Sequence, residues 1–186
     1  MAYIDEHIRA FTLSEIEASN INEVANLIAR KIVLERKCIY VAGNGGSAAD
    51  SQHFAAELVG RFETNREPLK AVALTTDTSA ISAIGNDFGF SDIYSRQLKA
   101  LGSDGDIFLG ISTSGNSKNI AEAAKIALDK KMTVILLSGS NIGTIDEFTD
   151  LIIRAKSSRT SIIQEFHIFV IHCICREIDR VAEQLR

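Results

Sequence analysis

Short apolar runs alternate with longer segments over most of this chain. Five runs have the length of buried strands, and they occupy residues 38–42, 71–74, 107–111, 134–137 and 151–153. Most of these runs are separated by enough residues for a helix, and such alternation is typical of βαβ units. The pattern therefore predicts an α/β protein built on a parallel sheet.

Helical periodicity appears at both ends of the chain and between the second and third runs. Apolar residues at helical spacing over 21–32 predict N-terminal helices, two of which meet near residues 19–20. Glycines punctuate two further helices, over 80–84 and 93–101. Residues 161–185 predict a long helix whose first half is apolar over most of its circumference. Such a helix usually packs on two partners, so we expect it to contribute to a subunit interface.

Composition narrows the classes of protein. The chain has 186 residues, 46% of them hydrophobic, and a formal net charge of −4, so we expect one folded domain and no nucleic-acid ligand. Within that domain, residues 1–36 would form the N-terminal helices and residues 37–186 the α/β core with the C-terminal helix. The apolar runs are far shorter than the ~20 residues of a membrane span, and the N-terminus lacks a signal-peptide core. We therefore expect a cytoplasmic protein without membrane contact.

Two turns rich in glycine and hydroxyl residues follow predicted strands. The first is Gly43–Ser47, and the second, Ser112–Ser117, carries four hydroxyl side chains within six residues. Each turn leads into a helical stretch, where unpaired backbone N–H groups and the helix dipole favour an anion. Because the carboxyl ends of parallel strands share one edge of a sheet, both turns are expected at the ligand-binding edge. This arrangement favours a phosphate or sugar-phosphate site.

Two other interpretations of the first turn remain open. Residues 43–48 fit the loose G-x-G-x-x-A form of a dinucleotide fingerprint, with Asp77 after the next strand. However, Asp77 lies further on than the usual ~20 residues, and a dinucleotide site does not explain the second turn. An ordinary strand-to-helix turn is the second alternative. No Walker-type lysine follows a glycine in the second turn, which favours a monophosphate over a nucleoside triphosphate.

His53 and Glu57 lie four residues apart on the helix that the first turn opens, so both lie on one face. Such a pair can be a surface contact that stabilises the helix by only ~0.3 kcal/mol. Its position favours chemistry, because Glu57 lies roughly 15 Å along the helix axis from Ser47. A phosphorylated six- or seven-carbon sugar, together with side-chain reach, could cover that span.

The C-terminal helix adds polar residues to an apolar background. Gln164 and His172 lie eight residues apart on one face, with Cα atoms ~12 Å apart by helical rise. Their side chains meet only by reaching toward each other, or else they serve sites in different subunits. His167 is more typical of a buried core histidine.

These motifs resemble those of the phosphoheptose isomerases, the sedoheptulose 7-phosphate isomerase branch of the sugar isomerase (SIS) domain family. The segments that carry the resemblance come in the family's order and cover nearly the whole chain: Gly43–Asp50, His53–Leu58, Gly85–Phe90, Gly110–Ser117, and Gln164-Glu165 leading to His172. The resemblance implies a five-stranded parallel sheet flanked by helices in three layers, as in flavodoxin. It also implies a homotetramer whose active sites are lined by neighbouring subunits.

The activity that the resemblance implies is conversion of sedoheptulose 7-phosphate to D-glycero-D-manno-heptose 7-phosphate. In that family this is the first step toward nucleotide-activated heptose for lipopolysaccharide or another surface glycan. Moving a carbonyl between C2 and C1 requires an acid and a base acting through an enediol. The resemblance assigns that acid/base work to Glu57 and His172.

The remaining site residues are also implied by matching motifs. The phosphate would be held by hydroxyl residues of both turns, namely Ser47, Ser112, Thr113, Ser114 and Ser117. The rest of the substrate would be lined by Glu57 and by Asn44, Gly45, Gly46, Asn86, Asp87 and Gln164. One zinc ion per subunit would be held by His53, Glu57, Gln164 and His172, where it would polarise the carbonyl.

One departure from the family and one rival function bear on this assignment. Where the family commonly has Arg-Ile-Gln-Glu, this chain has Ile162, and Arg159 is a candidate for the missing charge. The rival is a non-catalytic SIS protein that binds sugar phosphates or the replication initiator DnaA. Such relatives lack the glutamate and histidine of the acid/base pair, whereas this chain has both Glu57 and His172.

Overall fold

The structure is a computed structural model that describes residues 2–13 and 15–185. Five parallel strands form one sheet in the order β2-β1-β3-β4-β5. Their bounds are Ile39–Gly43 for β1, Ala71–Ala73 for β2, Ile107–Ser112 for β3, Thr133–Ser138 for β4 and Leu151–Arg154 for β5. All five apolar runs are therefore strands, and the predicted α/β fold with a five-stranded parallel sheet is confirmed.

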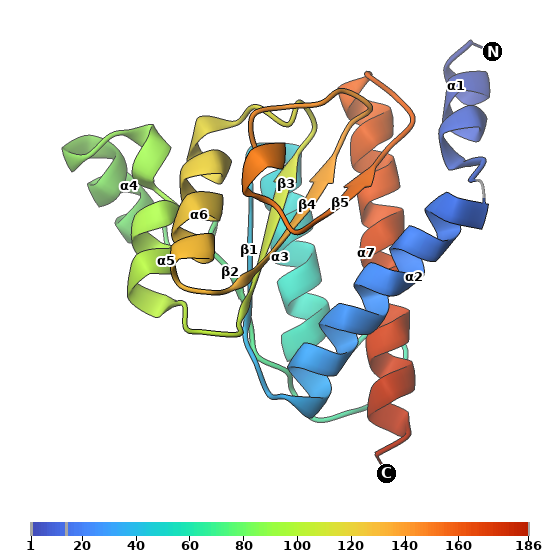
Figure 1. Cartoon of the computed structure of the whole chain (residues 1–186), viewed down its shortest axis with the longest axis horizontal. Coiled ribbons are helices and arrows are strands. Elements are labelled where there is room, and N and C mark those ends of the chain that lie inside the picture. The colour runs from blue at the N-terminus through green and yellow to red at the C-terminus, as the bar shows by residue number, and fades with distance from the viewer. Residues whose placement is uncertain (1, 14, 186) are drawn as a thin grey trace.

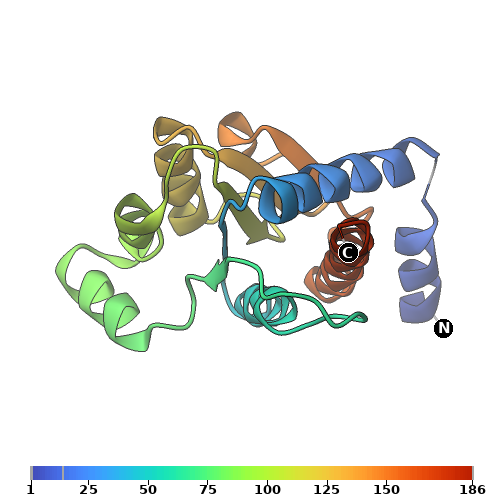
Figure 2. The ribbon, with the colours of Figure 1, turned by 90° about the horizontal axis from the view of Figure 1, so that it is seen from below.

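Helices cover both faces of the sheet, which gives the expected three layers (Figure 1, Figure 2). On one side lie α4 (Thr78–Asp87), α5 (Ser95–Leu101) and α6 (Lys118–Asp129), with the short 3₁₀ turns η2 (Phe90–Asp92) and η3 (Asp146–Phe148). On the other side lie α1 (Ala2–Phe11), α2 (Glu15–Ala29), a π-helical turn η1 (Arg30–Leu34), α3 (Gly46–Val59) and α7 (Thr160–Glu183).

Strand β1 shows why the apolar runs are unbroken. Ile39 and Val41 join the core under α2, α3 and α7, whereas Tyr40 and Ala42 join the core under α5 and α6. Successive strand residues point to opposite faces, and here both faces are covered by helices. A strand buried on both sides needs apolar residues at every position.

The predicted boundary between the two N-terminal helices is wrong. The sequence predicts a junction near residues 19–20, but α1 ends at Phe11 and α2 runs from Glu15 through Ser19 and Asn20. Both of these polar residues are exposed, so they lie on the solvent face of α2 without interrupting it. The hydroxyl of Thr12 donates to the carbonyl of Ile8 at 2.9 Å, at the end of α1.

The apolar circumference of α7 is accounted for within one chain. This helix packs on α2 along one side and on α3 along the other, and it also contacts α1 and β4. Figure 2 shows α7 nearly end-on between these helices. The two partners expected from its sequence are therefore helices of the same chain, and the apolar pattern by itself does not call for a second subunit. Within residues 2–13 and 15–185, no helix has the length and hydropathy required to traverse a membrane.

Candidate active site

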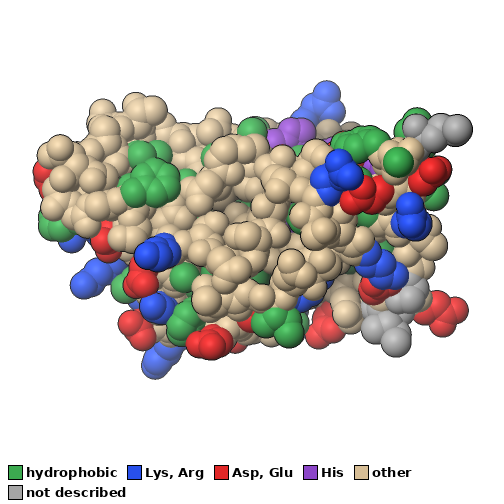
Figure 3. Space-filling model, turned by 90° about the horizontal axis from the view of Figure 1, so that it is seen from above, with side chains coloured by type: hydrophobic (Ala, Val, Ile, Leu, Met, Phe, Trp, Pro, Cys, Tyr) green, Lys and Arg blue, Asp and Glu red, His purple; other side chains and the backbone are tan. Residues whose placement is uncertain are grey.

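The two hydroxyl-rich turns lie side by side at the carboxyl edge of the sheet. They follow β1 and β3, which are neighbouring parallel strands with Gly43 opposite Ile111. The first turn leads to α3 on one face of the sheet and the second leads to α6 on the other face. In open α/β sheets, such a point of divergence forms the crevice where ligands bind. Figure 3 shows this edge, with uncharged polar groups and backbone over its middle and charged side chains mostly toward its margins.

Hydrogen bonds to neighbouring elements fix the first turn. The side chains of Asn44 and Asn119 exchange two hydrogen bonds of 2.9 and 2.8 Å, which join the turn to α6. The hydroxyl of Tyr94 donates to the carbonyl of Gly43 at 2.6 Å. Gly45 has φ +56°, in the left-handed region that favours glycine. The turn is therefore held rigidly at the start of α3, where Ser47 is buried.

The second turn presents its hydroxyls in two ways. Ser112 and Ser117 lie within hydrogen-bonding distance of each other, with 3.0 Å between their Oγ atoms. Ser114 is exposed and its Oγ accepts from the backbone N–H of Asn116 at 3.2 Å. The loop after β4 supports the turn, because the N–H of Thr144 donates to Oδ1 of Asn116 at 2.9 Å. The turn is preformed, and Thr113, Ser114 and Ser117 all retain solvent access.

His53, Glu57 and His172 come together where α3 packs on α7. Nε2 of His53 lies 3.1 Å from Nε2 of His172 and 3.5 Å from a carboxylate oxygen of Glu57. The ring of Phe62 stacks on His172 with 5.5 Å between the ring centroids. The side chain of His53 is 42% exposed and that of Glu57 is 23% exposed, so a ligand can reach both. The structure thus brings the imidazole of His172, which is 119 residues from His53 in the chain, to the neighbouring pair of His53 and Glu57.

Gln164 lies at the other end of the same helix pair. A Cβ added to Gly46 would lie 2.5 Å from Nε2 of Gln164, so this side chain sits directly on the start of α3. Because Gln164 faces Gly46 and His172 faces His53, α3 and α7 run side by side in the same direction. Gln164 and His172 remain separated by about two helical turns, ~12 Å. Gln164 is thus beside the phosphate turn and not beside the two histidines.

The implied zinc ligands are therefore only partly assembled in one chain. Two ligands at ~2.1 Å from a tetrahedral zinc ion are ~3.4 Å apart, so the contacts that His53 makes with His172 and Glu57 have a suitable spacing. Imidazole nitrogen and carboxylate oxygen are also the donors that zinc prefers. However, in the part of the chain that the structure describes, no group of three or more His, Cys, Asp or Glu side chains forms a ready metal centre.

Asn86 and Asp87 lie away from this cluster. They end α4, where both are exposed and hydrogen-bonded to each other at 2.8 Å. In Figure 1, α4 lies at the outer side of the molecule, beyond α5, whereas α3 and α7 lie on the other side of the sheet. The chain therefore does not bring these two residues to His53, Glu57 and His172.

Comparison with known proteins identifies the family. A model of the SIS domain matches residues 2–139. A phosphoheptose isomerase of Neisseria gonorrhoeae is 49% identical over 184 residues, which cover 97% of this chain and 93% of that protein. One from Campylobacter concisus is 54% identical over 143 residues, covering 77% and 76% of the two chains. The chain belongs to the phosphoheptose isomerase family of SIS-domain proteins.

Solved structures of the family show the same fold. The phosphoheptose isomerase structure from Neisseria gonorrhoeae aligns with a TM-score of 0.88 at 45% identity and covers 96% of both chains. One from Francisella tularensis aligns with a TM-score of 0.88 at 37% identity, covering 96% and 95% of the two chains. The SIS fold expected from the sequence is therefore confirmed.

The departure from the family at position 162 places an apolar side chain in the core. Ile162 is completely buried in the first turn of α7. Arg159, the candidate for a replacement charge, points instead to α1, where its Nε donates to a carboxylate oxygen of Glu6 at 2.8 Å. Its guanidinium also lies 5.8 Å from the ring centroid of Tyr3. Arg159 therefore contacts the N-terminal helix α1 and not the two hydroxyl-rich turns.

Two residues near the site were not singled out from the sequence. Asp50 lies one turn before His53, and its Oδ2 is buried without a hydrogen-bond partner in the described residues. Burial raises the pKa of the Asp50 carboxyl to about 6, although nearby His53 opposes the shift. Arg66 is buried and its Nη2 donates to the carbonyl of Glu57 at 2.7 Å. The three-residue spacing of Asp50 and His53 places Asp50 beside His53 on the helix and could have indicated Asp50 as a site residue. Arg66 lies in a loop, where no spacing pattern indicates its contact with Glu57.

Proposed function

We propose that this protein interconverts sedoheptulose 7-phosphate and D-glycero-D-manno-heptose 7-phosphate, as an aldose–ketose isomerase. The observation that carries the proposal is the placement of a carboxylate and two imidazoles on the same helix pair as the phosphate turn. Membership of the phosphoheptose isomerase family supports the same activity. Glu57 lies ten residues after Ser47, roughly 15 Å along α3, a span that an extended sugar phosphate covers together with the reach of the side chains at both ends.

The turns hold the phosphate in this proposal. Hydroxyls of Ser47, Ser112, Thr113, Ser114 and Ser117 and the N–H groups at the starts of α3 and α6 supply donors to the phosphate oxygens. Asn44, Gly45, Gly46 and Gln164 line the path from the phosphate toward the reacting carbons, a placement supported by the contact between Gly46 and Gln164. Preformed hydrogen bonds in both turns lower the entropic cost of binding.

Proton transfer falls to Glu57 and His172. The Glu57 carboxylate removes a proton from C1 of the ketose and delivers it to C2 of the resulting enediol, which gives the aldose. His172 gives a proton to the oxygen on C2 and accepts one from the oxygen on C1, so the overall proton count is unchanged. The 3.1 Å contact between His53 and His172 and the Phe62 ring stacked on His172 support this role, because they fix the imidazole in place.

A zinc ion held by His53, Glu57, Gln164 and His172, one per subunit, is part of the proposal. When bound, zinc polarises the substrate carbonyl and stabilises negative charge on the enediol oxygens. The donor types and the spacing around His53 support such a site, and Gln164 would have to approach from a different direction from the other three. A carboxylate bound to metal is a weaker base, so Glu57 does not serve as ligand and base at the same moment.

A homotetramer with shared active sites accounts for the residues that one chain leaves apart. Asn86 and Asp87 are exposed on α4 and distant from Glu57, and Gln164 is two turns from His172. Neighbouring copies that bring α4 and α7 to each other's turns would complete the site. We further propose that residues 1–186 act as one SIS domain in the cytoplasm.

The decisive experiment is an aldose–ketose assay of the purified protein on sedoheptulose 7-phosphate, with and without a zinc chelator. We expect wild-type turnover, loss of turnover in Glu57→Gln, and sugar-phosphate binding in both. Glutamine keeps the size of Glu57 but cannot accept the proton. Full activity in Glu57→Gln would reject the role of Glu57, and binding without turnover by the wild-type protein would favour the non-catalytic alternative.

A further inference from the structure

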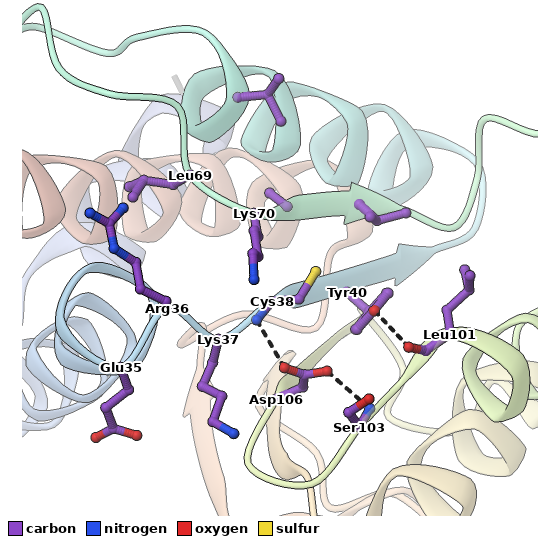
Figure 4. A pocket seen from close by; sticks show the side chains of 13 residues that line it. Glu35, Arg36, Lys37, Cys38, Tyr40, Leu69, Lys70, Leu101, Ser103 and Asp106 are labelled. Atoms are coloured by element: carbon purple, nitrogen blue, oxygen red, sulfur yellow. Dashed lines mark hydrogen bonds between the residues drawn. The ribbon is translucent and has the colours of Figure 1, made fainter.

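A second hollow lies at the amino edge of the sheet, at the opposite end of β1 from the phosphate turn (Figure 4). Its volume is about 570 Å³, within the range of small-molecule sites. The segment between η1 and β1, the start of β2 and the loop before β3 form its walls. The proposed isomerase reaction makes no use of this hollow.

Three cations from two segments line the hollow: Arg36, Lys37 and Lys70. Nζ of Lys37 donates to the carbonyl of Asp104 at 2.8 Å. Arg36 and Lys70 have no carboxylate within ion-pairing distance in the described part of the chain. In Figure 4 the amine of Lys70 points into the space above Cys38. Two cations are thus available to an anionic ligand.

The two carboxylates that line the hollow, Glu35 and Asp106, already have partners. Glu35 pairs with Arg30 at 3.2 Å, and its side chain points away from Lys70 in Figure 4. Asp106 is buried and accepts the backbone N–H groups of Cys38 and Ser103, each at 2.9 Å. Neither carboxylate forms an ion pair with Arg36 or Lys70, and the three cations outnumber the two carboxylates, so the hollow favours an anion although the whole chain has a net charge of −4.

One of these cations, Arg36, lies at a backbone position that glycine usually occupies. Arg36 has φ +56°, and among the described residues Lys131, with φ +58°, is the only other residue besides glycine with positive φ. Glycine is the usual residue for such a left-handed position at the end of a helix. At Arg36 the long cationic side chain is present in spite of that preference.

The rim of the hollow is apolar. Val59 and Leu101 are each 51% exposed and Val72 is 36% exposed, and all three line the hollow. The ring of Tyr40 lies beside them, with its hydroxyl donating to the carbonyl of Leu101 at 2.9 Å. Exposed apolar side chains beside free cations suit a ligand with a flat or apolar body and an anionic group.

We propose that this amino-edge hollow is a nucleotide-binding site, in which Arg36 and Lys70 hold the phosphate groups and the apolar rim holds the base. The site is separate from the isomerase site, because β1 spans five residues, ~13 Å, between the two edges. The proposal therefore does not depend on the isomerase assignment.

Calorimetric titration of the full chain with ADP tests the proposal. Arg36→Gly removes the cation and suits the backbone, so the variant should fold, and Lys131→Gly is the matched control with the same geometry outside the hollow. We expect Arg36→Gly and Lys70→Ala each to raise the Kd for ADP at least tenfold. Lys131→Gly and the double variant Ser112→Ala/Ser114→Ala should bind ADP as the wild type does.

Pyrophosphate and adenosine complete the test, since each carries only part of the ligand. We expect both to bind more weakly than ADP. Equal affinities for pyrophosphate and ADP would overturn the assignment of the rim to a base. Loss of ADP binding in the Ser112→Ala/Ser114→Ala variant would place the nucleotide at the phosphate turns, and unchanged binding in Arg36→Gly or no binding by the wild type would equally overturn the proposal.

Discussion

Removal of the Arg66 side chain is expected to destabilise the fold strongly, because Arg66 forms a buried ion pair with Asp179 of α7. Nε of Arg66 lies 2.8 Å from Oδ1 of Asp179, and the two side chains are only 3% and 4% exposed. Asp179 also accepts the backbone N–H groups of Glu63 and Thr64 at 3.0 and 2.9 Å. Arg66 therefore joins α7 to the end of α3, whose Glu57 carbonyl it also binds.

The magnitude follows from what Arg66→Ala would leave behind. Asp179 would keep two N–H donors but lose its counter-charge, and breaking a buried pair in this way costs about 3–5 kcal/mol. For a domain of this size, each kcal/mol shifts Tm by ~2–4 °C, so Tm should fall by roughly 6–20 °C. Native domains unfold with a free energy of ~5–15 kcal/mol, so a protein in the upper part of that range stays folded after this loss.

Urea unfolding followed by circular dichroism measures the effect, with Arg180→Ala as the matched control. Arg180 lies one residue after Asp179 and pairs with Glu177, but it is exposed, so its removal should lower the unfolding free energy far less than Arg66→Ala does. If Arg66→Ala and Arg180→Ala lowered the unfolding free energy equally, the buried pair would not have the role assigned to it. Activity measured on the folded fraction should fall too, because Arg66 braces the backbone of Glu57.

Two further predictions concern the phosphate turns and acid stability. Ser112→Ala/Ser114→Ala should weaken binding of the phosphorylated sugar about tenfold or more by removing two hydroxyl donors, and an unchanged Kd in a calorimetric titration would show that the phosphate lies elsewhere. Burial lowers the pKa of His167 to about 4, while its Nε2 stays bonded to the Ser138 carbonyl at 3.1 Å. Because the folded pKa lies below the unfolded value of ~6.5, stability should be complete above pH 6.5 and fall as pH drops toward 4, by about 3 kcal/mol in all. His167→Gln should lose that slope in unfolding free energy between pH 6.5 and 4, and an unaltered slope would assign acid sensitivity to other groups.

The sheet was predictable from the sequence because both of its faces are buried. Each strand must then be apolar at nearly every position, and a run such as Ile107–Ile111 is visible without any partner. The boundary between α1 and α2 was not predictable in the same way, since Ser19 and Asn20 are as acceptable on an exposed helix face as in a break. Apolar spacing identifies a helix better than it locates its ends.

The candidate site was predictable where it depends on local spacing and not where it depends on packing. The four-residue spacing of His53 and Glu57 places them on one face of α3 in any context. Their contact with His172 depends on how α7 packs on α3, which periodicity does not specify. Arg66 and Asp179 are 113 residues apart in the chain, and only the folded structure shows that they pair.

The parallel packing of α3 and α7 explains why the implied metal ligands divide as they do. Gly46 and His53 are seven residues apart on α3, and their partners Gln164 and His172 are eight residues apart on α7. Two helices packed in the same direction keep such pairs at opposite ends of the contact, ~10–12 Å apart. Gln164 can therefore join an ion held by His53, Glu57 and His172 if it comes from another copy of the chain, or if its side chain leaves Gly46 and reaches along α7. The first requires no change in the packed core, and so the division of these residues within one chain favours a site shared between subunits.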